Sequence, residues 1–109
     1  MLRIIKSKTD DNTLKEVAQD FDGYIKVVVD IQKQILAAGG KKHVDGEAML
    51  LKDGSKQEHL WGGGLDLETG EVDFDSMINI RPRQNNSSRE VLDKSIREKV
   101  ENIIRKLLK

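Results

Sequence analysis

One segment constrains the fold more than any other, because nine consecutive residues are almost all apolar or β-branched. This segment, YIKVVVDIQ, runs from Tyr24 to Gln32, and Lys26 and Asp30 are its main exceptions. β-Branched and aromatic side chains favour strands. A strand that is apolar in both alternating directions has to be covered on both faces. We therefore predict a strand that is buried on much of both faces and central in its sheet.

A strand and a helix are predicted before this segment. The strand is short, and the helix ends near Gly23, a residue that suits a helix C-terminus. Residues 10–13 offer several N-cap candidates. The helix has one apolar stripe, with residues at i, i+3, i+4 and i+7. The strand comprises Leu2, Ile4 and Ile5, and the stripe comprises Leu14, Val17, Ala18 and Phe21.

The residues after the central strand allow more than one interpretation. Residues 32–34 indicate a turn and residues 35–39 a second strand, with a helix over 31–38 as the alternative. Residues 43–51 favour a strand that has His43, Asp45 and Glu47 on one face and Val44, Ala48 and Leu50 on the other. The alternative there is a helix with Asp45 as its N-cap.

Residues 72–81 show the clearest alternation in the chain. Phe74, Ile78 and Ile80 fall on one side, whereas Asp75 and Asn79 fall on the other. This period of two predicts a strand that buries the first set and exposes the second. Proline cannot donate to a strand ladder, so the strand is expected to end at residue 82.

A C-terminal helix is predicted over residues 94–108, with Asp93 as its N-cap and a capping box of Ser95 and Glu98 as the alternative. Its apolar stripe comprises Ile96, Val100, Ile103, Ile104, Leu107 and Leu108. Several adjacent strands between two helices predict an α+β fold. We expect one domain over residues 1–109, with a small mixed or antiparallel sheet. The N-terminal and C-terminal helices would lie on one face, and the other face would be more polar.

Composition narrows the class of protein. The chain has no cysteine, so disulfides, thiolate metal sites and thiol nucleophiles are excluded. No signal peptide and no apolar run of about 20 residues is present, so we expect a soluble, cytoplasmic protein without a membrane partner. The formal net charge is zero and the four aromatic residues are scattered. Nucleic acid is therefore not the expected partner.

Two groups of polar residues are candidate sites. His43, Asp45 and Glu47 would share a strand face, with His59 nearby in sequence. Imidazole and carboxylates bind divalent metals, and a histidine oriented by a carboxylate can act as a general base. Alternating polar residues on one strand face more often form a solvated surface than a site, and this is the competing interpretation. A divalent metal is the only cofactor that the sequence suggests.

The second group surrounds Pro82. Guanidinium, amide and hydroxyl groups there suit recognition of a carboxylate or phosphate. An ordinary polar loop is the competing interpretation, since these residue types also favour loops. The candidate ligand-binding residues are Asn79, Arg81, Gln84, Asn86 and Arg89.

Residues 61–64 consist of a tryptophan followed by three glycines. The run Gly62–Gly64 lacks the Lys-Ser/Thr of a phosphate-binding loop and is expected in a hairpin or irregular strand. Trp61 is expected in the core or at a sheet edge.

Several of these segments also carry a family resemblance. The residues HVDGE from His43, GSKQEHLWG from Gly54 and FDSMINIRP from Phe74 are similar to an uncharacterised family of small bacterial and archaeal proteins, a domain of unknown function. Gln84, Asn86, Ser88 and Arg89 extend the similarity. The resemblance spans nearly the whole chain and implies a stand-alone prokaryotic domain. It implies no activity, substrate or cofactor.

A binding or interaction module is the function that the sequence favours. It would use the polar sheet face and the loop after Pro82. Its partner would be a polar or anionic small ligand or another protein, and homo-oligomer formation stays open. The alternative is a small metal-dependent or acid–base enzyme that uses His43, Asp45 and Glu47.

Overall fold

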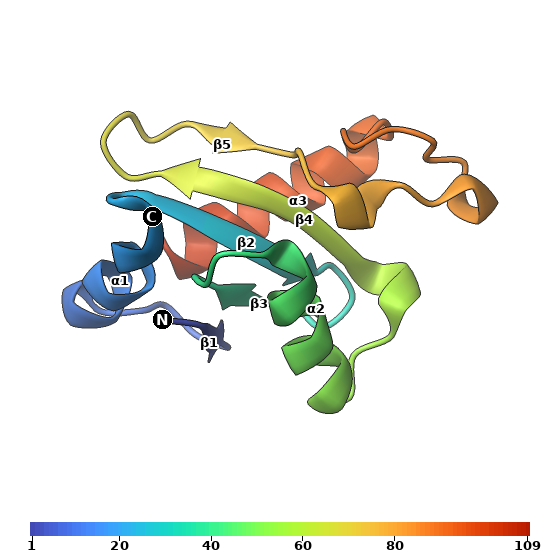
Figure 1. The fold of residues 1–109 in the computed structure, drawn as a ribbon. Coiled ribbons are helices and arrows are strands. Elements are labelled where there is room, and N and C mark those ends of the chain that lie inside the picture. Colours follow the sequence, from blue (N-terminus) through green and yellow to red (C-terminus); the bar gives the residue numbers. More distant parts are fainter.

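The computed structural model describes residues 1–109 and has five antiparallel strands, in the order β1-β3-β2-β4-β5 (Figure 1). The chain is an α+β fold, as the sequence predicted. The strands are β1 (Arg3–Ile5), β2 (Tyr24–Asp30), β3 (Ile35–Ala38), β4 (Leu60–Asp66) and β5 (Val72–Asp73). The helices are α1 (Asp11–Val17), α2 (His43–Lys52) and α3 (Lys94–Leu107).

The central strand β2 confirms the prediction made from its apolar run. It pairs with β3 on one side and β4 on the other. Ile25, Val27 and Val29 are buried on the face that α3 covers, and Val28 is buried on the opposite face. Asp30 is buried as well, but its carboxylate accepts hydrogen bonds from Ser55 Oγ and from the turn after the strand. The charge at the strand end is thereby satisfied.

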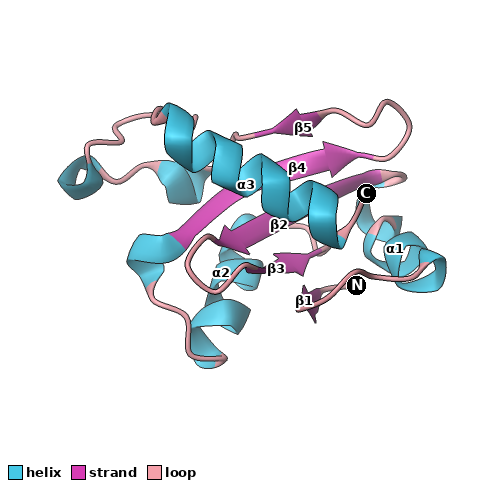
Figure 2. Ribbon diagram, turned by 180° about the vertical axis from the view of Figure 1, so that it is seen from behind, coloured by secondary structure: helices cyan, strands magenta, loops and turns pink.

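Helices cover both faces of the sheet (Figure 2). The larger buried cluster combines α3 with the inner sheet residues and includes Val17 of α1. The smaller cluster lies under α2 and includes Val28, Leu50 and Leu60. The face expected to be merely polar thus carries a helix of its own. None of the helices is both long and apolar enough to cross a membrane.

The preference for a strand over residues 43–51 was wrong. This segment is α2, and the helical alternative was right in kind, although the N-cap is Lys42 rather than Asp45. Gly46, Glu47 and Leu50 face inward, at i, i+1 and i+4. In so short a segment the alternation of polar and apolar residues fits both periods, so it does not select one.

The strand predicted over residues 72–81 was also mostly wrong. β5 ends at Asp73, and a 3₁₀ turn, Met77–Asn79, follows an isolated bridge at Asp75. Ser76 caps that turn by accepting a hydrogen bond from the Ile78 backbone N–H. The turn disrupts the alternation, so Asn79 is fully buried and Ile80 is 40% exposed, opposite to the prediction. Phe74 is buried as predicted.

The C-terminal helix matches its prediction closely. α3 begins after Asp93, whose carboxylate accepts hydrogen bonds from the backbone N–H groups of Ser95 and Ile96. Its predicted stripe faces the sheet, and Ile96 is the one member only partly buried. The helix therefore closes the larger core.

Candidate functional site

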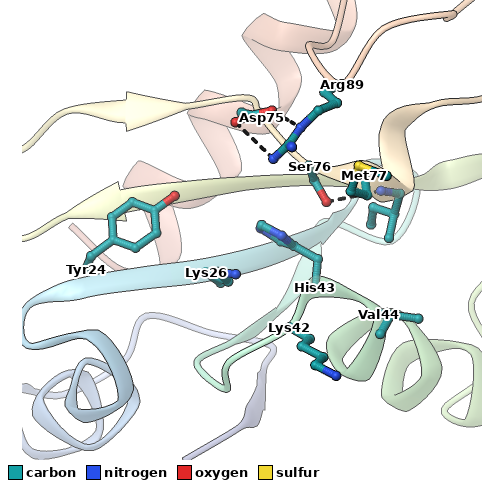
Figure 3. A pocket seen from close by; sticks show the side chains of 10 residues that line it. Tyr24, Lys26, Lys42, His43, Val44, Asp75, Ser76, Met77 and Arg89 are labelled. Atoms are coloured by element: carbon teal, nitrogen blue, oxygen red, sulfur yellow. Dashed lines mark hydrogen bonds and ion pairs between the residues drawn. The ribbon is translucent and has the colours of Figure 1, made fainter.

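A cavity of about 350 Å³ lies between the N-terminus of α2, strand β2 and residues 75–78 (Figure 3). We call it the His43 pocket. Its volume is at the lower end of the range for small-molecule sites. It is lined by Tyr24, Lys26, Lys42, His43, Val44, Asp75, Ser76, Met77, Ile78 and Arg89.

Glycines of β4 allow two walls of this pocket to pack against the strand. A Cβ atom at Gly64 would collide with the hydroxyl of Tyr24, and one at Gly62 would collide with Ser76. The side chains of Tyr24 and Ser76 therefore lie directly against the bare strand. The run Gly62–Gly64 is a regular part of a strand, and it brings two walls of the pocket close to the sheet.

His43 is the first residue of α2 and lies at the centre of the pocket (Figure 3). Its Nε2 is 2.7 Å from the carbonyl oxygen of Gly63. A carbonyl only accepts, so Nε2 carries the proton and Nδ1 presents a lone pair. Burial lowers the pKa of His43, and the charge of Lys26 acts in the same direction. Nδ1 has no partner within the chain and is not enclosed. It is thus an open hydrogen-bond acceptor.

The pocket lining carries more positive than negative charge. Lys26, Lys42 and Arg89 contribute three cations, and Asp75 is the one carboxylate. Lys26 Nζ donates to the carbonyl oxygen of Lys41 at 2.9 Å and lies 5.0 Å from the Phe21 ring centroid, but it makes no other hydrogen bond within the chain. The Lys42 side chain extends away from the ring of His43, at the rim (Figure 3). With His43 neutral, the net charge of the lining is positive.

Arg89 and Asp75 form a partly exposed ion pair over the pocket. Nε of Arg89 donates to Oδ1 of Asp75 at 3.0 Å, and Nη2 is 3.4 Å from Oδ2. Nη1 makes no hydrogen bond within the chain. An exposed pair of this kind is weak. Arg89 can therefore bind an additional anion with its remaining nitrogen.

The opposite wall is held by Tyr24 and Asp73. The hydroxyl of Tyr24 donates to Oδ2 of Asp73 at 2.6 Å. Burial raises the pKa of Tyr24, and the bond to Asp73 raises it further. The phenol stays protonated, and its proton is committed to Asp73. The bond between Tyr24 and Asp73 fixes this wall, and Tyr24 contributes its ring to the lining of the pocket.

Backbone donors complete the site. Lys42, the N-cap of α2, makes no side-chain hydrogen bond to the first turn. The first N–H groups of a helix have no intrahelical acceptor, and the positive end of the helix dipole lies beside them. The Asp45 N–H donates to the carbonyl oxygen of Lys42 at 3.2 Å, so the backbone N–H groups left for an acceptor are those that precede it in the first turn.

The predicted ligand-binding residues separate into two groups. Arg89 lines the pocket, whereas Asn79 and Asn86 are buried and tie the 75–92 segment together. The Asn79 amide nitrogen donates to the carbonyl oxygens of Gly62, Phe74 and Arg89, and its oxygen accepts from the Gly62 N–H. The Asn86 amide nitrogen donates to the carbonyl oxygens of Asn79, Ser88 and Glu90. Their amide nitrogens are therefore already engaged.

Arg81 and Gln84 fasten a different part of the chain. Arg81 donates to the carbonyl oxygens of Gln57 and Leu60, and its guanidinium lies 4.0 Å from the Trp61 ring centroid. Burial lowers the pKa of Arg81. Gln84 donates to the carbonyl oxygen of Glu58 at 3.0 Å. Arg81 and Arg89 thus have separate partners and line no common cavity.

The predicted metal-binding residues do not converge. The helix places His43 in the pocket, Asp45 on the exposed side and Glu47 under the helix, where it is 9% exposed. No group of three or more His, Cys, Asp or Glu side chains in the structure is arranged to hold a metal ion. His59 lies elsewhere, 3.9 Å from Glu58.

Sequence reasoning missed Tyr24, Lys26 and Ser76 as lining residues. Lys26 was recognised only as an exception in the apolar central strand, and that exception was the available signal. Strand alternation puts Tyr24 and Lys26 on one face. On β4, Gly64 pairs with Lys26, and its missing side chain leaves the place that the Tyr24 ring occupies, which only the strand pairing reveals.

Together, the fold and the pocket define a small α+β domain with a ligand-sized cavity on the α2 face of an antiparallel sheet. The chain matches the family described as "Protein of unknown function (DUF5674)" over residues 3–107 and belongs to that family. The predicted resemblance to an uncharacterised family is thus confirmed. No curated protein and no solved structure matches the chain.

Proposed function

We propose that the protein binds a small organic anion in the His43 pocket. The observation that carries the proposal is the positive charge around one cavity, with Lys26 and Arg89 in its walls and Lys42 at its rim, against a single carboxylate. Charge-assisted hydrogen bonds from such groups are the strong ones in anion recognition. The uncapped first turn of α2 adds favourable backbone donors.

His43 narrows the class of ligand. Its Nδ1 is an acceptor, because Nε2 is committed to the carbonyl of Gly63. An acceptor in a cationic cavity pairs best with a ligand that carries its own donor. We therefore expect a carboxylate or phosphate with a neighbouring hydroxyl or amino group. A ligand without that donor would leave Nδ1 unpaired when bound, at a cost in affinity.

The proposed site differs from the surface predicted from the sequence. It includes Arg89 from the loop after Pro82 and also His43, which the sequence suggested as a metal ligand or base. Asn79, Arg81, Gln84 and Asn86 support the chain segments around the pocket instead of contacting the ligand. Their hydrogen bonds to backbone carbonyls support this division.

NMR titration with lactate, propionate and inorganic phosphate tests the proposal. We expect saturable shifts at His43, Lys26 and Arg89 with lactate and weaker binding of propionate, which lacks the hydroxyl. Lys26→Gln should weaken lactate binding by roughly tenfold, the loss of one charge-assisted hydrogen bond. Lys15→Gln, an exposed lysine on α1, is the matched control and should leave affinity unchanged. Shifts that never saturate, or equal loss in both variants, would exclude the pocket as a binding site.

Acid–base catalysis is the second candidate, and the state of His43 favours it. A neutral imidazole with a fixed tautomer and an open Nδ1 in a cavity is what a general base requires. Asp45 and Glu47 have no part in this version. Turnover of a panel of esters and phosphate monoesters by the wild type and by His43→Gln tests it. Any turnover that survives in the variant argues against His43 as the base.

A further inference from the structure

The outer side of α2 carries an apolar patch. Val44, Ala48 and Leu51 recur at i, i+4 and i+7 and are all exposed, with Val44 52% and Leu51 41% exposed. The 3₁₀ turn that contacts α2 adds Met77, which is 64% exposed and lines the same cavity as Val44. We call these four residues the α2 patch. It contains three of the chain's seven exposed large apolar side chains, gathered on and beside one helix.

The polarity of α2 is partly inverted. Its buried residues include a glycine, Gly46, and a carboxylate, Glu47, beside Leu50, whereas an apolar stripe runs along its outer side. A surface helix normally has its apolar stripe toward the core and polar residues toward water. α2 lies on the side of the sheet opposite α3, with nothing in the chain above it (Figure 1). A concentrated, exposed apolar surface marks an interaction site.

The charged residues beside the patch are arranged so that two copies of the patch would be complementary. Asp45 and Lys52 are exposed on the flank of the stripe, and neither forms an ion pair within the chain. They lie on either side of Ala48 along the helix axis, seven residues apart. A two-fold axis near Ala48 would place Asp45 of each copy opposite Lys52 of the other. The small side chain of Ala48 permits close approach at the centre.

We propose that the protein forms a two-fold symmetric dimer through antiparallel contact of its α2 patches. A two-fold interface uses the same surface on both copies, so it requires self-complementarity. The patch meets this requirement with an apolar centre, one acid and one base. Val44 and Met77 also line the His43 pocket, so the second copy lies at the pocket mouth. The dimer does not depend on the proposed ligand.

Sedimentation velocity over a concentration series up to about 1 mM tests the association itself. The wild type is expected to shift from monomer to dimer with concentration. Leu51→Glu, which puts a charge on the apolar stripe, should weaken the dimer by about tenfold or more. Leu92→Glu is the matched control, because Leu92 is 54% exposed but precedes α3. A monomeric wild type, or a Leu51→Glu variant that dimerises like the control, overturns the proposal.

A charge exchange tests the antiparallel register. Asp45→Lys and Lys52→Asp should each weaken the dimer, since each creates like charges across the two-fold axis. The double variant restores opposite charges and should recover the wild-type dissociation constant within about threefold. Circular dichroism of each variant establishes that α2 is still folded. A double variant that is as weak as the single variants shows that Asp45 does not face Lys52, and the proposed arrangement is then wrong.

Discussion

The helices α3 and α2 cover opposite faces of one sheet, but their residues are distributed in opposite ways. α3 buries Val100, Ile103 and Ile104 and turns charged residues toward water. α2 buries Gly46 and Glu47 along with Leu50 and turns Val44 and Leu51 outward. α3 thus contributes chiefly to the stability of the chain itself. The contacts outside the chain that we propose both involve α2, at its uncapped N-terminus and along its outer stripe.

The largest effect is expected in the core beneath α3. Ile104→Ala removes a fully buried side chain from the larger cluster and should lower the free energy of unfolding by about 2–5 kcal/mol. Chemical denaturation monitored by circular dichroism measures it. A loss below about 1 kcal/mol would mean that α3 is loosely attached, and the contrast with α2 would fail.

The helices α3 and α2 also differ in their N-caps, because only α3 has a side chain that caps its first turn. Asp93 caps α3, and hydrogen bonds from Ser95 and then from Ile96 lower its pKa. A lowered pKa in the folded state means that the carboxylate stabilises the fold above the unfolded value of 3.8. That contribution is lost as the pH falls from 3.8 through the folded pKa. Asp93→Ala should therefore lower the melting temperature at neutral pH, and by less than Ile104→Ala does.

Melting at low pH tests whether the charge of Asp93 is the cause of this stabilisation. Below the folded pKa of Asp93 the wild-type carboxyl is protonated, so its advantage over alanine should shrink. Melting curves of both proteins from neutral pH to about pH 2 measure the difference. A difference that stays constant over this range would show that Asp93 acts without its charge.

Sequence patterns predicted the parts of the fold in which pattern and burial coincide. The α3 stripe keeps the helical period over the whole helix, and the run in β2 is apolar in both alternating directions. The polar and apolar residues of 43–51 fit both periods, and the inward Glu47 gives α2 no simple apolar stripe. Residues 72–81 alternate in sequence, but the Asn79 side chain replaces strand hydrogen bonds and allows a turn.

The candidate site was less predictable than the fold. Its walls come from β2, α2 and the segments at residues 75–78 and 89, which are distant in sequence. Only the strand pairing reveals that Gly62 and Gly64 lie beside the face that carries Tyr24 and Lys26. Arg89 was identified from its residue type, and His43 was identified for a different chemistry. Residue type suggested candidates, but convergence depends on tertiary contacts.

The missing cap of α2 predicts a conflict between stability and binding. Lys42 has the extended backbone of an N-cap residue but no capping side chain. Lys42→Ser should raise the free energy of unfolding by about 0.5–1 kcal/mol by capping the first turn. The same change removes a pocket cation and occupies a backbone donor, so lactate should bind more weakly. Denaturation and NMR titration of one variant measure both effects. A more stable variant with unchanged binding would show that the first turn of α2 has no role in the site.

The smallest effect on stability is expected on the outer side of α2, where a matched pair of substitutions compares the two helices directly. Valine and threonine have nearly the same shape, so valine-to-threonine changes mainly polarity. Val100→Thr places a hydroxyl in the core beneath α3 and should cost about 1–3 kcal/mol. Val44→Thr, at a position 52% exposed, should change the unfolding free energy of the monomer by less than about 0.5 kcal/mol.

The concentration of the protein separates the effect of Val44→Thr on the monomer from its effect on the proposed dimer. In dilute solution the dimer dissociates, so denaturation there measures the stability of the monomer alone. At high concentration the same Val44 variant should dimerise more weakly, because its hydroxyl must be desolvated at the interface. A large loss in dilute Val44→Thr would show that the α2 stripe is already covered within one chain, and the contrast between the two helices would disappear.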